Sequence, residues 1–292
     1  MLITVIMPCY NRERYLALAI NSVLCQTWPM VELIVVDDGC TDGSRSILES
    51  YGSRIRLLEH PGRVNRGQSA AINLGLRHAT GEYIAILDSD DLFAPEKIEK
   101  QMRFLECHQD VGLVYSNGKA IDADGKELYF IYKRDHQPPS GPADVLENCC
   151  VNLPSNALVR RAVFERAGFF DEHLRTAQDH DMVIRITEVA TVGYLDEVLW
   201  FYRRHDASIS STKALERWQN GFRILDAARR RYPYPARTLK RRLAVLNFRL
   251  GQCYLEQRAY FRAVYHFIRA GMLDPSRSAR VIRGREAVSG PH

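Results

Sequence analysis

The stretch YIAILDSDDLFAP, residues 83–95, joins a short apolar run to three carboxylates within four positions. The apolar run has the composition of a buried β-strand. Asp88, Asp90 and Asp91 follow it, and they would repel one another if all three were ionised and unpaired. A metal ion, hydrogen bonds at a helix start, or solvent are the three ways to compensate them.

The residues on either side of this stretch alternate between β-branched runs and amphipathic segments. We expect strands at 2–8, 31–39, 54–60 and 82–91, and helices at 13–27, 44–52, 69–80 and 95–109. This alternation predicts an α/β fold: Rossmann-like, with a mostly parallel central sheet and helices on both faces. Ligands of such sheets bind beyond the carboxyl ends of the strands, where Asp37, Asp38 and the 88–91 cluster fall.

The later part of the chain changes character. Between 111 and 150 we expect strands, a turn at 122–127 and a Pro/Gly-rich loop at 137–144. A loop, a helix over 179–190 and a strand over 192–205 are expected next. From about residue 213 an Arg-rich helical pattern takes over. The prediction is therefore a domain over 1–212 followed by a basic α-helical region over 213–292.

The last region also resembles one unit of a helical repeat. Residues 249–275 fit the tetratricopeptide pattern at Leu250, Gly251, Tyr254, Ala263, Phe267, Ala270 and Pro275. One repeat cannot bury its own faces, so it is expected to pack on a preceding helix or on the front domain. It is interpreted either as a helical tail that completes the fold or as a groove for a partner.

The charge of the chain is unevenly distributed. Residues 211–292 carry 18 Lys and Arg against 5 Asp and Glu, a balance of +13, and the remainder carries −8. The basic region is either a solvated face or a contact with an anionic membrane. Nucleic acid is not expected as a partner, because most of the tyrosines in this region stand at helix-core spacing or beside prolines.

The composition also bears on compartment. No apolar run reaches the roughly 18–20 residues of a membrane span, and the first residues lack a basic leader. The seven cysteines are scattered without C-x-x-C spacing, which fits reduced thiols better than disulfides or a zinc site. We expect a cytoplasmic protein, with peripheral attachment to the inner face of the membrane as an open alternative.

The carboxylates at the strand ends have structural and functional interpretations. One Asp suffices to cap the helix after the 88–91 cluster, so three carboxylates favour Mg²⁺ or Mn²⁺ bound together with substrate phosphates. Asp37 and Asp38 either form the turn around Gly39 or accept hydrogen bonds from a base or ribose.

Two further groups of polar residues are equally ambiguous when taken alone. Asp179 and Asp181 stand at a helix start, where a carboxylate caps the helix or acts as a general base. Arg203, Arg204 and His205 follow a strand, where they bind phosphate oxygens or pair with the acidic front of the chain.

In their order, these pieces resemble the inverting glycosyltransferases of family 2, which have a GT-A fold. The resemblance covers roughly residues 2–210, and five segments carry it: 5–28, 32–44, 65–101, 153–186 and 201–210. Five motifs in the family's order are far more specific than an isolated D-x-D. The resemblance divides the first domain into a nucleotide-sugar half, about 1–115, and an acceptor half, about 116–212.

The resemblance implies a nucleotide-diphosphate sugar donor (UDP-, GDP- or dTDP-linked) and an acceptor hydroxyl on a polysaccharide, lipid-linked or other cell-surface glycan precursor. It places in the donor site Pro8, Tyr10, Asn11, Glu13, Asp37, Asp38, Asn73, Asp88, Ser89, Arg204 and His205. Asp90 and His205 would hold Mn²⁺ or Mg²⁺, with Asp91 in support. Asp179 matches the catalytic base of a displacement with inversion, which needs no protein nucleophile.

The sequence departs from the family pattern in places. Ile72 precedes Asn73, where many relatives carry Arg, so phosphate contacts from that helix are in question. Ala214 stands where the Gln of the processive synthases' Gln-x-x-Arg-Trp motif would be, which favours addition of a single sugar. The alternative function is a non-catalytic nucleotide-sugar-binding scaffold whose helical tail recruits partners.

Overall fold

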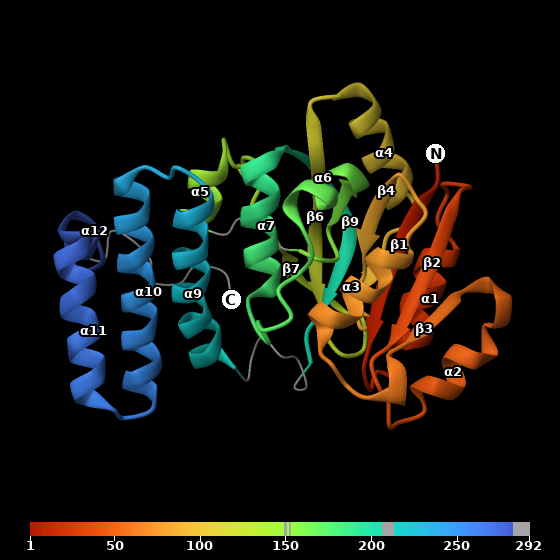
Figure 1. The fold of residues 1–292 in the computed structure, drawn as a ribbon, viewed down its shortest axis with the longest axis horizontal. Helices are drawn as coiled ribbons and strands as arrows, with labels where there is room; N and C mark the ends of the chain where they lie inside the picture. Colours follow the sequence, from red (N-terminus) through yellow and green to blue (C-terminus); the bar gives the residue numbers. More distant parts are fainter. Residues whose placement is uncertain (149–150, 152, 206–212, 283–292) are drawn as a thin grey trace. The chain divides into compact units, whose positions relative to one another are not determined.

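The structure is a computed structural model that describes residues 1–148, 151, 153–205 and 213–282 (Figure 1). The chain forms two compact units, the first made of residues 1–141 and 150–205 and the second of residues 142–149 and 206–292. No helix within the described residues combines the length and the apolar character that crossing a membrane requires.

A nine-stranded sheet runs through the first unit. Its order is β3-β2-β1-β4-β8-β6-β9-β5, and β7 pairs with β6 outside this path. The strands are β1 (Ile3–Cys9), β2 (Val31–Asp37), β3 (Arg56–Glu59), β4 (Tyr83–Ile86), β5 (Leu92–Phe93), β6 (Val111–Ile121), β7 (Glu127–Phe130), β8 (Ala157–Arg160) and β9 (Thr191–Arg203).

The sheet is parallel in its first half and mixed in its second. Strands β1 to β4 pair in parallel, as the strand–helix alternation predicts. Strand β8 is antiparallel to both β4 and β6, so β6 resumes the direction of β4 and β9 runs parallel to β6. The predicted α/β class is confirmed, although "mostly parallel" describes only the half of the sheet that strand–helix units build.

Helices cover both faces of the sheet. They are α1 (Leu16–Leu24), α2 (Ser44–Ser50), α3 (Gln68–His78), α4 (Lys97–Cys107), α6 (Arg161–Ala167) and α7 (Gln178–Val189), with 3₁₀ turns at Gly52–Arg54 and Pro61–Arg63. Alternation along the buried strands sorts the contacts, because successive side chains point to opposite faces. Leu33 and Val35 join the core that includes Leu16 of α1, whereas Ile34 and Val36 pack with Ala71 of α3.

The second unit is α-helical. Its helices are α5 (Pro142–Glu147), α9 (Ala214–Arg231), α10 (Ala236–Glu256), α11 (Tyr260–Leu273) and α12 (Pro275–Ile282), and α9, α10 and α11 lie side by side in Figure 1. Arg241 of α10 pairs with Glu147 of α5 at 3.2 Å. Phe267 of α11 packs against Gly251 of α10. That this helix pair is a tetratricopeptide repeat stays a prediction.

Candidate active site

The site lies at the edge of the sheet where parallel strands end together. Cys9 at the end of β1 pairs in register with Asp37 at the end of β2, and β4 lies on the other side of β1. The segments that follow these strands therefore meet at one edge, and they carry most of the polar side chains singled out in the sequence.

Asp90 is held by two basic side chains from distant parts of the chain. Arg12 Nε donates to Asp90 Oδ2 at 2.9 Å, and His205 Nε2 lies 3.0 Å from the same oxygen. Burial acts to raise the pKa of Asp90, but the hydrogen bond with His205 and the charge of Arg12 outweigh it and hold this pKa below its usual value. Both partners thus favour the carboxylate form of Asp90, and its role as a metal ligand stays a prediction.

Arg12 has no role in the predictions made from the sequence. It lies inside YNRERY at 10–15, where its charge reads as one of several solvated basic groups. Its guanidinium also donates to the carbonyls of Tyr10 and Asn11 at 3.3 and 3.0 Å. The sequence did contain one signal that could have identified Arg12. It is a basic residue four positions after Pro8, just past the end of a buried strand.

Asp88 is a buried acid of the same loop whose pKa is raised, in contrast to that of Asp90. Gln68 Nε2 donates to Asp88 Oδ1 at 2.6 Å, and the Asp88 backbone N–H donates to Ser155 Oγ at 3.2 Å. Burial, followed by the charges of Asp90 and Asp179, raises the pKa of Asp88 to about 7. The charges of Asp90 and Asp179 thus both act on Asp88.

Asp179 reaches this group from the first turn of α7. The helix follows Ala177, whose φ of 62° turns the chain into it. Gln178 Nε2 donates to Gln68 Oε1 at 2.7 Å, so a chain of amides runs from α7 through α3 to Asp88. Neither Gln68 nor Gln178 was singled out in the sequence, because an amide at a helix start carries no distinctive spacing.

The neighbouring Asp181 has a different environment. Its Oδ2 pairs with Arg185 at 2.8 Å, and Arg185 also donates to the carbonyls of Ala167 and Phe169. Both side chains are largely buried. Asp181 therefore fixes the turn after α6, and Asp179 is left as the acid of this pair that faces Asp88.

Asp91 and Arg203 connect the acidic loop after β4 to the end of β9. The Arg203 backbone N–H donates to Asp91 Oδ1 at 2.9 Å, and Arg203 Nε donates to the Asp90 carbonyl at 3.0 Å. The guanidinium lies over the ring of Tyr15, 4.8 Å from its centroid. Burial, then the charges of Asp90 and Asp88, raise the pKa of Asp91 well above its ordinary value. Asp91 thus holds the loop to the end of β9, and its expected support of a metal at Asp90 stays a prediction.

Arg204 points elsewhere. It is exposed, and its Nη1 donates to the hydroxyl of Tyr129 on β7 at 3.0 Å. Arg203 is the last residue of β9, and Arg204 follows it. Of the two, only the buried Arg203 reaches the acidic loop. Strand alternation explains the difference, because consecutive side chains at a strand end face opposite sides.

Hydrogen bonds connect the segments after β1 and β2, and they are made by side chains predicted to bind the donor. Asn11 adopts φ 52°, and its Oδ1 accepts the Thr41 N–H at 2.8 Å. Glu13 Oε2 accepts the Gly43 N–H at 2.7 Å. Pro8 is buried in β1, and Tyr10 is exposed beyond it. The structure therefore brings these four residues to one edge of the site.

Asp37 and Asp38 organise backbone around the same edge. Asp37 accepts the Cys40 N–H at 2.8 Å and an Arg45 N–H at 3.2 Å. Asp38 accepts the N–H groups of Arg66 and Gly67 at 2.7 and 2.8 Å, although burial still raises its pKa. Both interpretations of the pair thus stand: they shape the turn, and Asp38 lies beside the loop that enters α3.

Two remaining site candidates are buried. Asn73 donates to the Phe170 carbonyl at 2.9 Å and accepts the Phe170 N–H at 2.8 Å, and it also donates to Glu172. Its amide therefore ties α3 to residues 170–172, which is a positioning contact. Ser89 is buried within the acidic loop between Asp88 and Asp90.

These residues suit a cation that brings some of its own ligands. Within the described part of the chain, no three His, Cys, Asp or Glu side chains gather as a metal-binding group. Asp90 Oδ2 is taken by Arg12 and His205, and the mutual repulsion of Asp88, Asp90 and Asp179 favours an added positive charge. Mg²⁺ and Mn²⁺ fit such a donor set, because they bind through one or two carboxylates together with substrate phosphates.

Known structures share this fold. The chain superposes on residues 1–349 of TarS from S. aureus with a TM-score of 0.69 and 21% sequence identity, covering 94% of this chain and 83% of that one. It superposes on the mannosyltransferase PcManGT from Pyrobaculum calidifontis, solved with GDP-Man and Mn²⁺, with a TM-score of 0.64 and 20% identity over 97% and 78% of the two chains.

Proteins that are similar to this chain in sequence carry the name glycosyltransferase. A glycosyltransferase of Rickettsia typhi without characterised function is 34% identical over 72% of this chain and 66% of its own length, so the match leaves a third of that relative uncovered. The putative glycosyltransferase EpsE of Bacillus subtilis is 30% identical over 78% of this chain and 82% of its own. The family model described as glycosyl transferase family 2 matches residues 4–168. The chain therefore belongs to glycosyl transferase family 2, as its motifs predicted.

Proposed function

We propose that the chain transfers a sugar from a nucleotide-diphosphate donor to an acceptor hydroxyl with inversion at the anomeric carbon. The observation that carries the proposal is the pair of hydrogen bonds through Gln68, which joins Asp88 of the acidic loop to Gln178, the neighbour of Asp179 at the start of α7. Two acids after β4 and one at the start of α7 supply what the reaction needs: a site for the donor and a base for the acceptor.

Asp179 is proposed as the base. It takes the proton of the acceptor hydroxyl while that oxygen forms a bond to the anomeric carbon on the face opposite the diphosphate. The bond between the anomeric carbon and the diphosphate oxygen breaks, and the diphosphate departs with the electron pair. The amides of Gln68 and Gln178 hold α3 and α7 together, so the base keeps its distance from Asp88.

The donor is proposed to lie over the ends of β1, β2 and β4. Pro8, Tyr10, Asn11, Glu13 and Asp38 line the nucleotide end, and Asp88 faces the ribose. A divalent cation, Mn²⁺ or Mg²⁺, held by Asp90 would neutralise charge on the diphosphate. Related folds have been solved with UDP-GlcNAc in TarS and with GDP-Man and Mn²⁺ in PcManGT, which supports a nucleotide sugar of this class.

The acceptor is proposed to be the hydroxyl of a glycan precursor, lipid-linked in the simplest case. The basic region 213–292 supports this proposal, because its positive charge is attracted to an anionic membrane where such acceptors reside. A cytoplasmic protein held at the inner face of a membrane would meet donor and acceptor at the same place.

A panel of UDP-, GDP- and dTDP-sugars tests the proposal. Each is scored first by thermal shift with Mn²⁺, because a donor that binds the native state raises its apparent stability. Donors that bind are then assayed for transfer and hydrolysis. Stabilisation and turnover by the wild type, with stabilisation alone in Asp179→Asn, is the expected result. Stabilisation without turnover in the wild type would instead favour the scaffold interpretation.

A further inference from the structure

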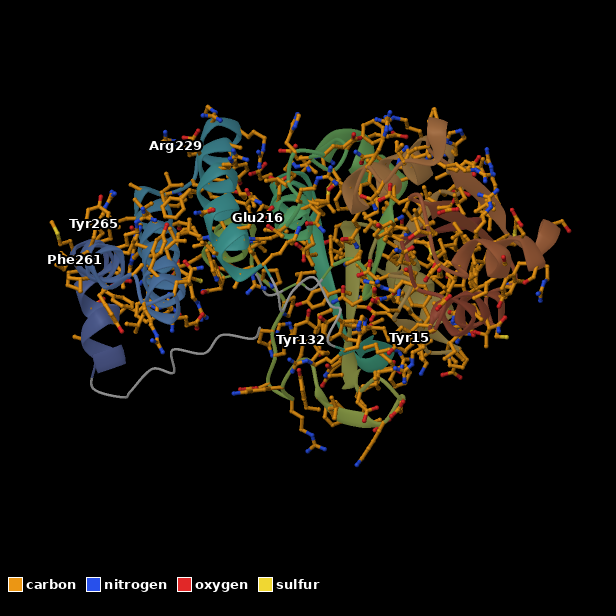
Figure 2. All side chains as sticks on the ribbon, turned by 90° about the horizontal axis from the view of Figure 1, so that it is seen from below. Tyr15, Tyr132, Glu216, Arg229, Phe261 and Tyr265 are labelled. Carbon is orange, nitrogen blue, oxygen red and sulfur yellow. The ribbon has the colours of Figure 1, made fainter. Side chains whose placement is uncertain are left out.

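Helix α11 carries an apolar stripe on the side that faces away from α10. Six side chains on it are more than half exposed, with Phe261 at 95% and Met272 at 72%. We call this set the α11 stripe, and its members are Tyr260, Phe261, Val264, Tyr265, Ile268 and Met272. Figure 2 labels Phe261 and Tyr265 at the outer edge of the helical unit.

The stripe is not needed to pack the helix. The opposite side of α11 already meets α10: Ala263 and Ala270 are buried, and Phe267 lies against Gly251 and Phe248. The helix is therefore apolar on two sides, whereas a surface helix of a globular protein is normally polar on its outer side. A contiguous exposed stripe of this kind marks a contact surface.

The charge around the stripe is of one sign. From Gln257 to Leu273 the sequence has no Asp or Glu, but it has Arg258, Arg262 and Arg269. The Arg269 guanidinium donates to the Tyr265 hydroxyl at 3.1 Å. Arg262 lies over the ring of Tyr254, 5.7 Å from its centroid. Arg269 thus contacts a stripe residue directly, and Arg262 lies on α11 beside α10.

We propose that the α11 stripe inserts into the headgroup region of an anionic phospholipid bilayer, with the helix lying in the plane of the interface. Aliphatic and aromatic side chains enter the acyl boundary, tyrosine hydroxyls stay at headgroup depth, and the arginines reach lipid phosphates. Charge complementarity favours lipid over a protein occupant, because the charged side chains of α11 are arginines beside an uncharged stripe, which matches a layer of phosphates above hydrocarbon.

The inference deepens the proposed function, since a lipid-linked acceptor gives membrane binding its purpose, but the binding itself requires neither donor nor catalysis. It also narrows the earlier expectation. The sequence left the whole basic region as either a solvated face or a membrane contact made through charge, whereas the stripe names one helix and adds an apolar contribution that salt does not screen.

Flotation of the full chain with vesicles tests the surface. We expect binding to phosphatidylcholine–phosphatidylglycerol vesicles and little binding to pure phosphatidylcholine vesicles. Phe261→Glu with Ile268→Glu is expected to lower binding about tenfold or more, because removing one buried large apolar side chain alone has that effect. Leu128→Glu is the matched control: it is 48% exposed on β7 in the other unit, and it should bind as the wild type does.

A second variant separates insertion from surface attraction. Phe261→Trp places a fluorophore in the stripe, and its emission, taken as the difference from the wild type, should shift to the blue with anionic vesicles and keep part of that shift in high salt. A folded chain that fails to float with anionic vesicles in low salt would overturn the inference. Flotation of the double glutamate variant equal to that of the wild type would also overturn it. So would a dimer, detected by sedimentation, that the glutamate substitutions dissociate while neither protein binds lipid.

These measurements fail independently of the proposed chemistry. Vesicle binding without sugar transfer in the full donor panel would leave the α11 surface intact and remove the transferase proposal. Transfer to a water-soluble acceptor by a chain that does not bind vesicles would do the reverse.

Discussion

Gln68 Nε2 donates a hydrogen bond to Asp88 Oδ1 at 2.6 Å, and Gln68 Oε1 accepts one from Gln178 at 2.7 Å. One amide at the start of α3 therefore connects the acidic loop after β4 with the helix that carries Asp179. Replacing Gln68 by Leu breaks both bonds with a side chain of similar length. Because the hydrogen bond from Gln68 opposes the rise in the pKa of Asp88, the variant should need a higher pH for full activity.

The measurement for Gln68→Leu is the pH profile of kcat/KM. Its acid limb is expected to move to higher pH, with the KM for the donor raised. Ser69→Ala is the control, since Ser69 is buried next to Gln68 in the same turn of α3. If kcat/KM falls by the same factor at every pH and the acid limb does not move, Gln68 has a structural role alone.

Asp179→Asn removes the proposed base and keeps its size. Transfer should fall by about 10²–10⁴-fold, the usual contribution of a general base, while the donor still raises the melting temperature. Asp181→Asn serves as the comparison, because Asp181 pairs with Arg185 and its loss should lower stability more than kcat. Retention of wild-type transfer by Asp179→Asn would remove the base from α7.

Arg12→Gln frees Asp90 from its guanidinium partner. The charge of Arg12 lowers the pKa of Asp90, so this pKa should rise in the variant, and a cation should now compete for the carboxylate more easily. Without donor, Mn²⁺ is expected to raise the melting temperature of Arg12→Gln more than that of the wild type, although transfer falls.

Arg14→Gln is the matched control for Arg12. Its guanidinium pairs with Asp124, and both side chains are well exposed, so removing it should change neither response. An equal Mn²⁺ shift in Arg12→Gln, Arg14→Gln and the wild type would show that Arg12 does not compete with a cation for Asp90.

The raised pKa of Asp88 makes stability depend on pH in a definite direction. The pKa is about 7 in the folded chain against an ordinary value of 3.8, so the folded protein binds the additional proton between these values. The stability that this proton contributes is complete below about pH 4 and is lost as the pH rises through about 7. The melting temperature should therefore fall more steeply with rising pH between about pH 4 and pH 7 in the wild type than in Asp88→Asn, and parallel curves would contradict the assignment.

Gly39 sits in a turn that tolerates no side chain. Its φ is 81°, and an added Cβ would lie 2.8 Å from both the Arg63 carbonyl oxygen and the Asn65 nitrogen. Gly39→Ala should lower the free energy of unfolding by about 1–3 kcal/mol and weaken donor binding, because the turn joins Asp38 to Cys40. Gly141→Ala, where a Cβ would meet nothing within 4 Å, should leave both unchanged.

The sequence predicted the parts of the fold that depend on periodicity. The runs at 2–8 and 31–39 became β1 and β2, because buried parallel strands require continuous β-branched residues. Periodicity does not encode strand direction, so the antiparallel β8 and the mixed half of the sheet could not be derived from it. Helix α6 was expected as a loop, since seven residues are too few to show a helical pattern.

Some residues of the candidate site could also be predicted from the sequence, and others could not. Carboxylates at strand ends could be placed from the sequence, because the strands fix their position within a residue or two. Side chains that reach the site from a distance could not: Arg12, Gln68 and Gln178 are ordinary polar residues until the fold aligns them. Arg204 and Asn73 show the converse, since position in a motif did not determine which way each side chain points.

The single oxygen Asp90 Oδ2 is shared by Arg12 and His205, which are 78 and 115 residues away in the sequence. Arg12 is thus a counter-ion built into the chain at the position proposed for the metal. On that proposal, Mn²⁺ or Mg²⁺ would bind only by displacing the guanidinium, and the phosphate oxygens of the donor would supply the ligands that the amino acids leave open.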